Sequence, residues 1–445
     1  MHPAILYAGG FVYAFHGLAD GTIVSAGFSD SRLCVLGVPL PTPVKPFKPR
    51  ADMSDSFDNG ALLPAGLHDT LPPHAAQEMA VISGIMNVFR ASGYEQVKPP
   101  LVEFESTLVG NGTNGGGSLA GQMFRVMDPV SQRMMAVRAD ITLQVARIAE
   151  ARLADEVRPL RLSYAGEILR VRGNQLRPER QFAQVGLELI GAAGVVADVE
   201  VVSLAAEALA AAGVSRPTVD LNSPALVTNI LAQLDLDATT AQDLRAALDR
   251  KDGDSTGDIL RCQGVAFSDA AKALCALIEA VGPADKVIRE LNEIQLPPDA
   301  RAEVERLSTV VAGLRAAVPD LPLTLDPVEY RGFEYHTGVS FTLFAEGVRG
   351  ELGRGGRYIT GAGEAATGVT LYMDSILRAL PTPDRGDRLY LPYGTAFREG
   401  AAFREAGWIT VAAISADEDS AECARRAECS HLLIDGAPAE VGDDT

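Results

Sequence analysis

The stretch Tyr330-Arg-Gly-Phe-Glu-Tyr-His-Thr-Gly338 places a cation, a carboxylate, a phenol and an imidazole within six residues. A run typical of a strand follows at 339–344, and a glycine cluster follows at 350–358. Successive side chains of a strand point to opposite faces, so some of these polar groups are expected to line a pocket while others face the core. An ordinary polar edge strand with a glycine turn is the alternative, and these residues alone do not decide between the two.

Other segments predict the strands that would accompany this stretch. Residues 161–171 and 181–191 indicate two strands joined by a polar turn at 172–180. Residues 134–142 predict a strand that enters a helix, with Asp140 or Thr142 near its cap. Residues 94–104 predict a strand interrupted by Pro99 and Pro100, which belongs at a sheet edge or an interface.

Helices are predicted on both sides of these strands. Apolar residues at steps of three and four indicate an amphipathic helix over 79–89, and 198–213 is an alanine-rich helix. Residues 222–320 have helical spacing throughout and predict a helical insertion, after which strand character returns at 321–344. Residues 366–380 predict a strand that runs into a helix, and strands alternate with helices after Pro383.

The composition favours a large acidic chain. Its 445 residues are 47% hydrophobic, which is enough for two or three domains. The formal net charge of −19 disfavours nonspecific contact with nucleic-acid phosphates. Five scattered cysteines without a Cys-x-x-Cys pair indicate a reducing, cytoplasmic compartment and predict no metal site. Cys262 and Cys275 fall in helical segments, where we expect small buried residues.

Residues 1–52 show no clear period and contain a proline-rich tract at 39–46. We expect a poorly ordered N-terminal extension there, with Met53 as a candidate start of the native protein. The apolar run at 4–19 contains His16 and two adjacent glycines and has no basic residues before it. Neither a transmembrane helix nor a signal peptide is therefore expected.

Polar residues from three segments are expected to form one pocket. Carboxylates facing an arginine, beside amide and phenol groups, suit the ammonium and carboxylate of an amino acid. Structural salt bridges are the alternative. The residues are Arg138, Asp140, Glu167, Arg170, Gln184, Glu188, Arg331, Glu334, Tyr335 and His336.

The order of these segments resembles the class II aminoacyl-tRNA synthetases, and histidyl-tRNA synthetase in particular, over residues 60–380. The helix at 79–89 and the Pro99-Pro100 strand resemble the first motif, which forms the dimer interface. Residues 162–191 resemble the second motif, with Arg170 at its ATP-phosphate arginine. Residues 137–142 stand where an acidic residue holds the substrate ammonium, and 330–338 resembles the histidine-specific loop.

This resemblance implies an α+β fold, an antiparallel sheet flanked by helices. The core would comprise residues 53–221 and 321–380. The helical insertion at 222–320 would interrupt it, and residues 384–445 would form a small α/β remnant of the anticodon-binding domain.

Three departures from the synthetase pattern bear on activity. The third motif needs an arginine to clamp the ATP tail, but Asp374-Ser375 stands where Glu-Arg is expected. The second motif needs Arg-x-Glu for adenine, and this chain has Arg170-Val-Arg172. The following Arg-Pro-Gln pattern is replaced by Gly-Asn-Gln at 173–175. Adenylyl transfer depends on positioning and charge neutralisation, and losing one such group costs on the order of a hundredfold in rate. The departures imply that adenylation is lost.

A chain that keeps the amino-acid pocket without the adenylating groups resembles the regulatory subunits of ATP phosphoribosyltransferase. The resemblance implies a non-catalytic subunit that pairs with a short-form catalytic subunit in the first step of histidine biosynthesis. It also implies self-association through the class II core, feedback by histidine, no cofactor and no tRNA partner. Asp140, Gln184, Glu188, Arg331 and Tyr335 are the predicted histidine-like pocket, and Arg170 is a vestigial phosphate-binding residue.

Two other activities are compatible with the scaffold. An active histidyl-tRNA synthetase is the first, and the missing third-motif arginine counts against it. A ligase that uses a non-tRNA acceptor is the second, and it needs ATP as well. The sequence also leaves open whether an inhibitory histidine binds this pocket or the contact with the catalytic subunit.

Overall fold

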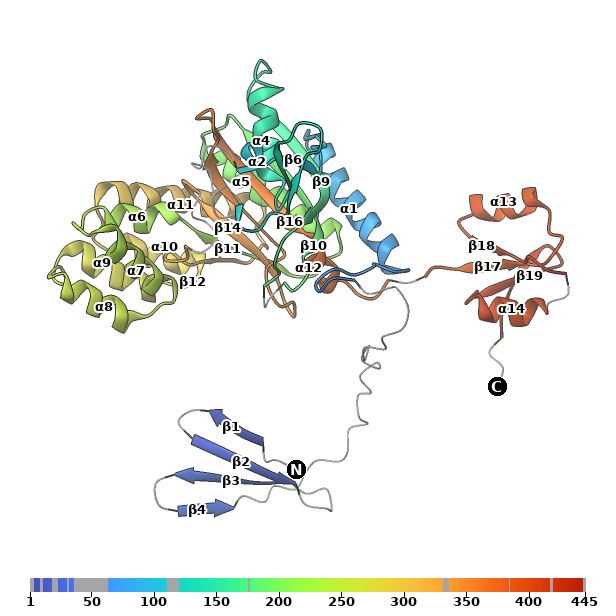
Figure 1. Cartoon of the computed structure of the whole chain (residues 1–445), viewed down its shortest axis with the longest axis horizontal. Coiled ribbons are helices and arrows are strands. Elements are labelled where there is room, and N and C mark those ends of the chain that lie inside the picture. The colour runs from blue at the N-terminus through green and yellow to red at the C-terminus, as the bar shows by residue number, and fades with distance from the viewer. Residues whose placement is uncertain are drawn as a thin grey trace. The chain divides into compact units, whose positions relative to one another are not determined.

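The computed structural model describes residues 63–109, 120–174, 177–330, 336–383, 385–416 and 419–442, together with the backbone of four strands before residue 36 (Figure 1). The chain divides into two compact units, 1–62 and 63–445. Arg331, Glu334 and Tyr335 lie outside the described residues.

The first unit contains a four-stranded antiparallel sheet. Its strands are β1 (Ala4–Ala8), β2 (Phe11–Gly17), β3 (Ile23–Ser29) and β4 (Arg32–Val35), paired in chain order. The poorly ordered extension expected over residues 1–52 remains a prediction. β-branched and aromatic residues such as Ile5, Tyr7 and Val12 favour extended backbone even where no longer period is visible.

A nine-stranded sheet forms the centre of the second unit. Its order is β12-β13-β11-β14-β15-β16-β10-β9-β5, and all pairs are antiparallel except β11–β13 and β5–β9. The strands are β5 (Glu95–Gln96), β9 (Leu160–Leu169), β10 (Gln181–Ile190), β11 (Pro217–Asn222), β12 (Gly282–Pro283), β13 (Leu323–Leu325), β14 (Ser340–Ala345), β15 (Gly353–Ile359) and β16 (Ala365–Tyr372).

Helices cover both faces of this sheet. α1 (His74–Ala91) and α5 (Val195–Ala211) pack with the odd-numbered residues of β10, Val185 among them. α4 (Thr142–Ala151) packs with the even-numbered residues, such as Phe182. The two faces of β10 therefore belong to different environments, and this decides which of its side chains can form a pocket.

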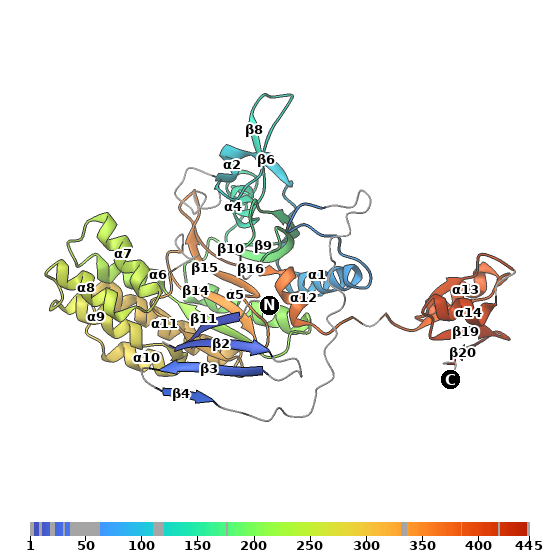
Figure 2. The ribbon, with the colours of Figure 1, turned by 60° about the horizontal axis from the view of Figure 1, so that its bottom comes forward.

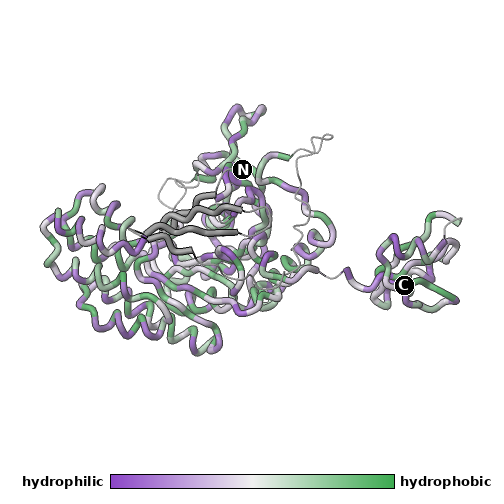
Figure 3. The backbone as a smooth tube through the Cα atoms, turned by 90° about the horizontal axis from the view of Figure 1, so that it is seen from below, coloured by the Kyte–Doolittle hydropathy of each residue, from purple (hydrophilic) through white to green (hydrophobic). Residues whose placement is uncertain are grey.

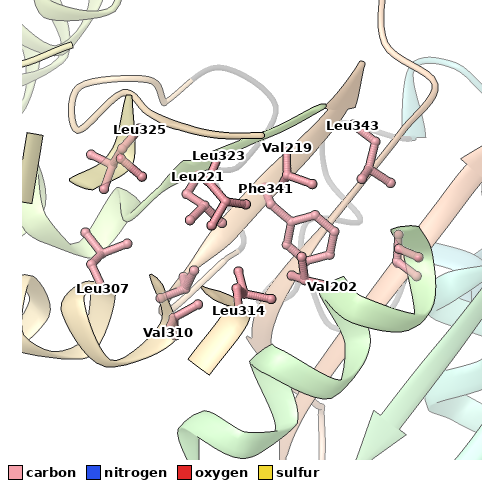
Figure 4. Close-up of a cluster of buried hydrophobic side chains, with 14 of the residues drawn as sticks. Val202, Val219, Leu221, Leu307, Val310, Leu314, Leu323, Leu325, Phe341 and Leu343 are labelled. Carbon is pink, nitrogen blue, oxygen red and sulfur yellow. The ribbon is translucent and has the colours of Figure 1, made fainter. Parts of the chain in front are cut away.

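Six helices lie between β11 and β13 in the sequence: α6 (Pro224–Leu231), α7 (Ala238–Asp249), α8 (Gly253–Cys262), α9 (Asp269–Glu279), α10 (Ala284–Glu293) and α11 (Pro298–Ala317). They gather beside the end of the sheet formed by β12, β13 and β11 (Figure 2). Leu307, Val310 and Leu314 of α11 face apolar side chains of β11, β13 and β14 (Figure 4). The helices of the insertion thus share the core of the sheet, while the domain boundaries remain predictions.

Cys262 and Cys275 are exposed, so the prediction that they are buried was wrong. α9 buries Leu274 and Leu277 on one face, and Cys275 lies on the other. Helical phase, rather than the preference of cysteine for the interior, decided its position.

The predicted strand at 94–104 is two strands in two sheets. β5 is an edge of the large sheet, whereas β6 (Val102–Phe104) pairs with β8 (Met134–Val137) in a three-stranded sheet that also holds β7 (Arg125–Met127). Short helix α2 (Glu105–Val109) follows β6. Pro99 and Pro100 separate the two pairings, because proline cannot donate to a ladder.

After α12 (Met373–Ala379), strands alternate with helices as the sequence predicts. β17 (Arg388–Leu391), α13 (Phe397–Glu405), β18 (Ile409–Ala412), α14 (Ser420–Arg426), β19 (His431–Ile434) and β20 (Ala437–Glu440) form a sheet of order β18-β17-β19-β20 with two helices. Its descent from an anticodon-binding domain remains a prediction.

Hydrophilic and hydrophobic stretches alternate along the described chain (Figure 3). None of the described helices is both long enough and apolar enough to span a bilayer.

Candidate functional site

Even-numbered residues of β10 form the floor of the candidate pocket. Gln184, Gly186 and Glu188 share the face that α4 covers, and all three are buried. A Cβ on Gly186 would lie 2.4 Å from the hydroxyl of Tyr164 and 2.4 Å from the carbonyl oxygen of Val369. Glycine is needed here because the Tyr164 side chain crosses between the two polar residues.

Asp140 and Gln184 are joined directly. Gln184 Nε2 donates to Asp140 Oδ2 at 2.9 Å, and its Oε1 accepts the Ile141 N–H at 3.1 Å. The other carboxylate oxygen of Asp140 accepts the Thr142 N–H at 2.9 Å. The start of α4 therefore fixes Asp140, and Gln184 orients it.

Glu188 ends a network of hydroxyl groups. Tyr358 donates to its Oε2 at 2.9 Å, and the hydroxyl of Tyr164 lies 3.5 Å from its Oε1. The Tyr164 hydroxyl also lies 2.7 Å from that of Thr370 and 3.2 Å from that of Thr142. These contacts link Glu188 to the start of α4, where Asp140 lies.

Burial raises the pKa of Glu188 to about 8, although the Tyr358 hydrogen bond opposes the shift. The side chain is 1% exposed. Glu188 is accordingly protonated at neutral pH and can donate a hydrogen bond to a basic nitrogen.

A small cavity adjoins Glu188. Its volume is about 10 Å³, roughly the space of one water molecule. Thr142, His336, Arg354 and Tyr358 line it with the glycine-rich backbone of β15. His336, whose direction the sequence left undecided, is buried and faces this cavity.

The structure thus brings together Asp140, Gln184 and Glu188 of the predicted pocket. Arg331 and Tyr335 stay predictions because they lie outside the described residues. Arg170 donates through Nε to the carbonyl oxygen of Ala139 at 3.2 Å, and its guanidinium carbon lies 5.2 Å from the Phe182 ring centroid.

Two other residues of the expected pocket lie elsewhere. Arg138 is buried beneath it, where Nε donates to the Glu167 carbonyl at 2.7 Å and Nη1 to that of Pro99 at 3.1 Å. The side chain of Glu167 lines a cleft with Glu78 and Asp374 instead, and burial raises its pKa. Strand alternation is the reason, since Glu167 pairs with Ala183 on the α1 face of the sheet.

Sequence reasoning missed Tyr164 and Thr370 as members of the network. Tyr164 lies opposite Gly186, and Gly368 lies opposite Glu188, two residues before Thr370. The strand register that identifies them depends on pairing across β9, β10 and β16. No local motif carries that information.

A buried ion pair occupies the start of α12, where the sequence has Asp374-Ser375. Arg177 Nε lies 3.0 Å from Asp374 Oδ2, and its Nη2 donates to Ser375 Oγ at 3.3 Å. The guanidinium carbon stands 3.8 Å from the ring centroid of Tyr372 and 4.9 Å from that of Phe182. Arg177 is 6% exposed, so the turn before β10 is closed onto α12 by a side chain of the protein itself.

Among the described residues, no group of three or more His, Cys, Asp or Glu side chains is arranged to hold a metal ion.

Comparison with known proteins gives a consistent result. A family model of histidyl-tRNA synthetase matches residues 66–376. An ATP phosphoribosyltransferase regulatory subunit from Rhodospirillum centenum is 52% identical over 384 residues, which cover 86% of this chain and 97% of the relative.

Solved structures share the fold. The crystal structure described as an ATP phosphoribosyltransferase regulatory subunit/histidyl-tRNA synthetase from Bacillus halodurans superposes with a TM-score of 0.71 at 22% identity, covering 82% of this chain and 96% of that one. A chain of the ATP phosphoribosyl transferase (HisG:HisZ) complex from Thermotoga maritima gives 0.52 at 16% identity, covering 66% and 97%.

Proposed function

Since the chain belongs to the family of ATP phosphoribosyltransferase regulatory subunits, which share the histidyl-tRNA synthetase fold, we propose that it acts by binding a separate short-form catalytic subunit. It is a non-catalytic subunit that serves the first step of histidine biosynthesis. The phosphoribosyl transfer itself takes place on the partner chain.

The observation that carries this proposal is the start of α12, where Ser375 stands in place of the expected arginine. The Asp374 side chain is 6% exposed and pairs with Arg177 at 3.0 Å and with Arg378 at 3.5 Å. A nucleotide triphosphate needs positive charge that is available to its phosphates. Here the two nearest described arginines are engaged by a carboxylate of the protein, which supports a role without adenylation.

Co-purification and reconstitution test the proposal. The chain is co-expressed with a short-form ATP phosphoribosyltransferase catalytic subunit, and formation of phosphoribosyl-ATP is measured for each chain alone and for the pair. We expect high activity only with the pair. Full activity of the catalytic chain alone, unchanged by this chain, would contradict a regulatory role.

The sheet pocket is proposed to bind histidine as the effector, which requires the cavity of about 10 Å³ beside Glu188 to widen. A half-buried carboxylate, an amide and a protonated acid suit an ammonium group and an imidazole nitrogen. Asp140, Gln184 and Glu188 support this assignment, and we propose that Arg331 and Tyr335 complete the pocket. Histidine can regulate the complex only if its affinity differs between the active and inhibited assemblies.

Calorimetry of the complete complex tests this effector site. Tyr335→Ala and Gln184→Ala should weaken histidine binding about tenfold or more, as expected when a hydrogen bond to a charged ligand is lost. The exposed Arg172→Ala serves as a control. Unchanged binding in the pocket variants would place the inhibitory histidine at the contact with the catalytic subunit.

Self-association through the sheet edge is proposed as well. β5 is the last strand of the nine-stranded sheet, and Met79 of α1 beside it is 68% exposed. A groove of about 680 Å³ lies between α1 and β5, lined by Met79, Ile82 and Met86 among others. An apolar groove at an open sheet edge suits a second copy of the chain. Met79→Glu places a charge in this groove and should lower the sedimentation coefficient to the value expected for a monomer.

We also propose a cytoplasmic protein without a tRNA partner. All four described cysteines are free thiols, and the net charge is −19. Free thiols suit a reducing compartment, and a strongly acidic chain repels tRNA phosphates. Filter binding with tRNA at low salt should show no retention.

A further inference from the structure

A short stretch after β13 joins the helical insertion to the sheet. This base segment comprises residues 326–330, and its first N–H, that of Asp326, donates to the carbonyl oxygen of Leu221 in β11 at 3.0 Å. Its last residue, Tyr330, directly precedes Arg331, which we assign to the sheet pocket. The contacts of the base segment therefore bear on where that part of the pocket begins.

The end of α7 holds the base segment on the side of the insertion. Lys251 Nζ forms an ion pair with Asp326 Oδ2, and the Asp326 side chain is only 13% exposed. Asp249 Oδ1 accepts the Tyr330 N–H at 3.0 Å. Arg245 Nη1 donates to the Tyr330 hydroxyl at 3.2 Å. Both ends of the base segment are thus bonded to the same part of the insertion.

Asn222 holds the base segment on the side of the sheet. Its side chain is fully buried, and its Nδ2 donates to Glu329 Oε2 at 3.1 Å. Its Oδ1 accepts a hydrogen bond from Ser340 Oγ, directly opposite in the pairing of β11 and β14. A buried amide that loses one of its partners is unfavourable. Glu329 and Ser340 are therefore positioned through one side chain.

Ser340 shares a packing surface with His336. Gly356 of β15 contacts both, since an added Cβ there would lie 2.5 Å from His336 Cδ2 and 2.7 Å from Ser340 Cβ. His336 in turn lines the cavity beside Glu188. Contacts therefore run without a break from α7 through the base segment and Asn222 to the sheet pocket.

We propose that the helical insertion positions the sheet pocket through the base segment, with Asn222, Glu329 and Lys251 as positioning residues. The inference rests on the proposed function, because the ligand of this pocket is the histidine assigned there. Coupling between separated sites is carried by packed side chains and hydrogen bonds. Binding in the sheet pocket then responds to contacts of α7, although α7 supplies no residue to the cavity beside Glu188.

Paired substitutions test the connection. Glu329→Leu removes the acceptor and leaves the buried Asn222 amide unpaired, whereas Glu329→Gln keeps an acceptor oxygen and is the matched control. Lys251→Met removes the ion pair with Asp326 and keeps an unbranched side chain. Arg250→Gln, at an exposed neighbouring position, is the control for Lys251→Met.

Two measurements are made on each variant. Calorimetry of the complex with the catalytic subunit gives the affinity for histidine. Hydrogen exchange of amides 336–340 is measured on the full-length chain alone, without ligand. The Thr337 N–H, which donates to the Arg357 carbonyl oxygen at 2.8 Å, reports on the stretch that carries His336. Exchange requires no histidine binding, so it is independent of the effector assignment.

We expect Glu329→Leu to weaken histidine binding about tenfold or more and to accelerate exchange at 336–340 by a similar factor, while Glu329→Gln behaves like wild type. Lys251→Met should have the same effects at about two- to fivefold, because the lysine is 41% exposed. Arg250→Gln should change neither quantity.

If wild type binds no histidine, the effector assignment fails and the exchange data alone decide this inference. If Glu329→Leu does not fold, the comparison of Lys251→Met with Arg250→Gln decides it. Exchange at 336–340 that stays at the wild-type rate in the folded Glu329→Leu and Lys251→Met proteins overturns the proposal. Acceleration of equal size in Glu329→Gln and Glu329→Leu overturns it as well.

Discussion

At the scale of single residues, the chemistry of the sheet pocket depends on Glu188. The acid is buried by strand pairing, and Tyr358 and the Tyr164 hydroxyl hold it in place. Its raised pKa keeps it protonated near neutrality. A neutral donor beside the carboxylate of Asp140 gives the pocket two different polar ends, which suits a ligand that carries both an ammonium and a neutral imidazole.

Glu188→Gln should change the pH dependence of stability. The folded pKa of about 8 exceeds the ordinary value of 4.5, so the folded wild type binds the additional proton and loses stability as pH rises from about 4.5 to about 8. The glutamine variant has no such proton to lose. We expect its free energy of unfolding, relative to wild type, to increase by up to about 4 kcal/mol between pH 5 and pH 9. Urea denaturation at both pH values measures this. If the difference in unfolding free energy between the variant and wild type were the same at pH 5 and pH 9, Glu188 would not have a raised pKa.

Gly368→Ala should displace Glu188. A Cβ at position 368 would lie 1.8 Å from Glu188 Oε2, a separation that the structure cannot keep. We expect destabilisation of about 1–3 kcal/mol and loss of ligand binding in the pocket. Gly253→Ala, where no atom lies within 4 Å of the added Cβ, is the control. Equal stability of both variants would argue against the close contact.

The resemblance to the synthetase motifs singled out Gln184 and Glu188, and strand alternation explains why these two residues share a face. Glu167 was expected in the same pocket, but its register opposite Ala183 places it on the other face. Asp140 was predicted from its place before α4, and Thr142 N–H binds it there. Tyr164 and Thr370 required the register between strands, which sequence patterns do not contain.

At the scale of elements, buried arginines join segments that are distant in sequence. Arg177 fastens the turn before β10 to α12. Arg357 of β15 pairs with Asp198 of α5 at 2.8 Å, and Arg357 also donates to the carbonyl oxygens of Ala192 and Gly194. Element positions were largely predicted from periodicity, but these connections were not, because ion pairs across the fold leave no local pattern.

Arg177→Ala should release the turn. The substitution removes two aromatic contacts and leaves Asp374 buried with fewer partners, at a cost of about 3 kcal/mol. Hydrogen exchange of amides in 170–181 should accelerate at least about tenfold. Arg172→Ala, an exposed arginine of the same turn, is the control. If these amides exchanged at the wild-type rate in a folded Arg177→Ala protein, Arg177 would not be what holds the turn to α12.

Asp198→Ala should destabilise the junction of α5 and β15. It leaves Arg357 buried without its counter-ion, which costs roughly 3–5 kcal/mol. The surface pair Arg315–Asp285 offers a comparison, since Asp285 is 52% exposed and Asp285→Ala should cost less than about 1 kcal/mol. Chemical denaturation of both variants measures their unfolding free energies. If Asp198→Ala and Asp285→Ala destabilised the protein by similar amounts, burial would not explain the larger effect expected at Asp198.

At the scale of the whole molecule, the chain has the histidyl-tRNA synthetase fold, and Ser375 stands at the start of α12 where an arginine is expected. The fold class followed from the order of motifs, and the sequence relatives agree with it. The shared core of sheet and insertion could not be foreseen, because it arises from the packing of α11 on α5 and β11.

Histidine-dependent ATP–pyrophosphate exchange by the purified chain alone tests the central claim most directly. The account predicts no exchange above the rate without enzyme, because Ser375 stands where the ATP-clamping arginine is expected and the neighbouring Arg177 and Arg378 pair with Asp374. An active histidyl-tRNA synthetase assayed in parallel verifies the assay. Exchange by this chain at a rate comparable to that of the synthetase would contradict the account.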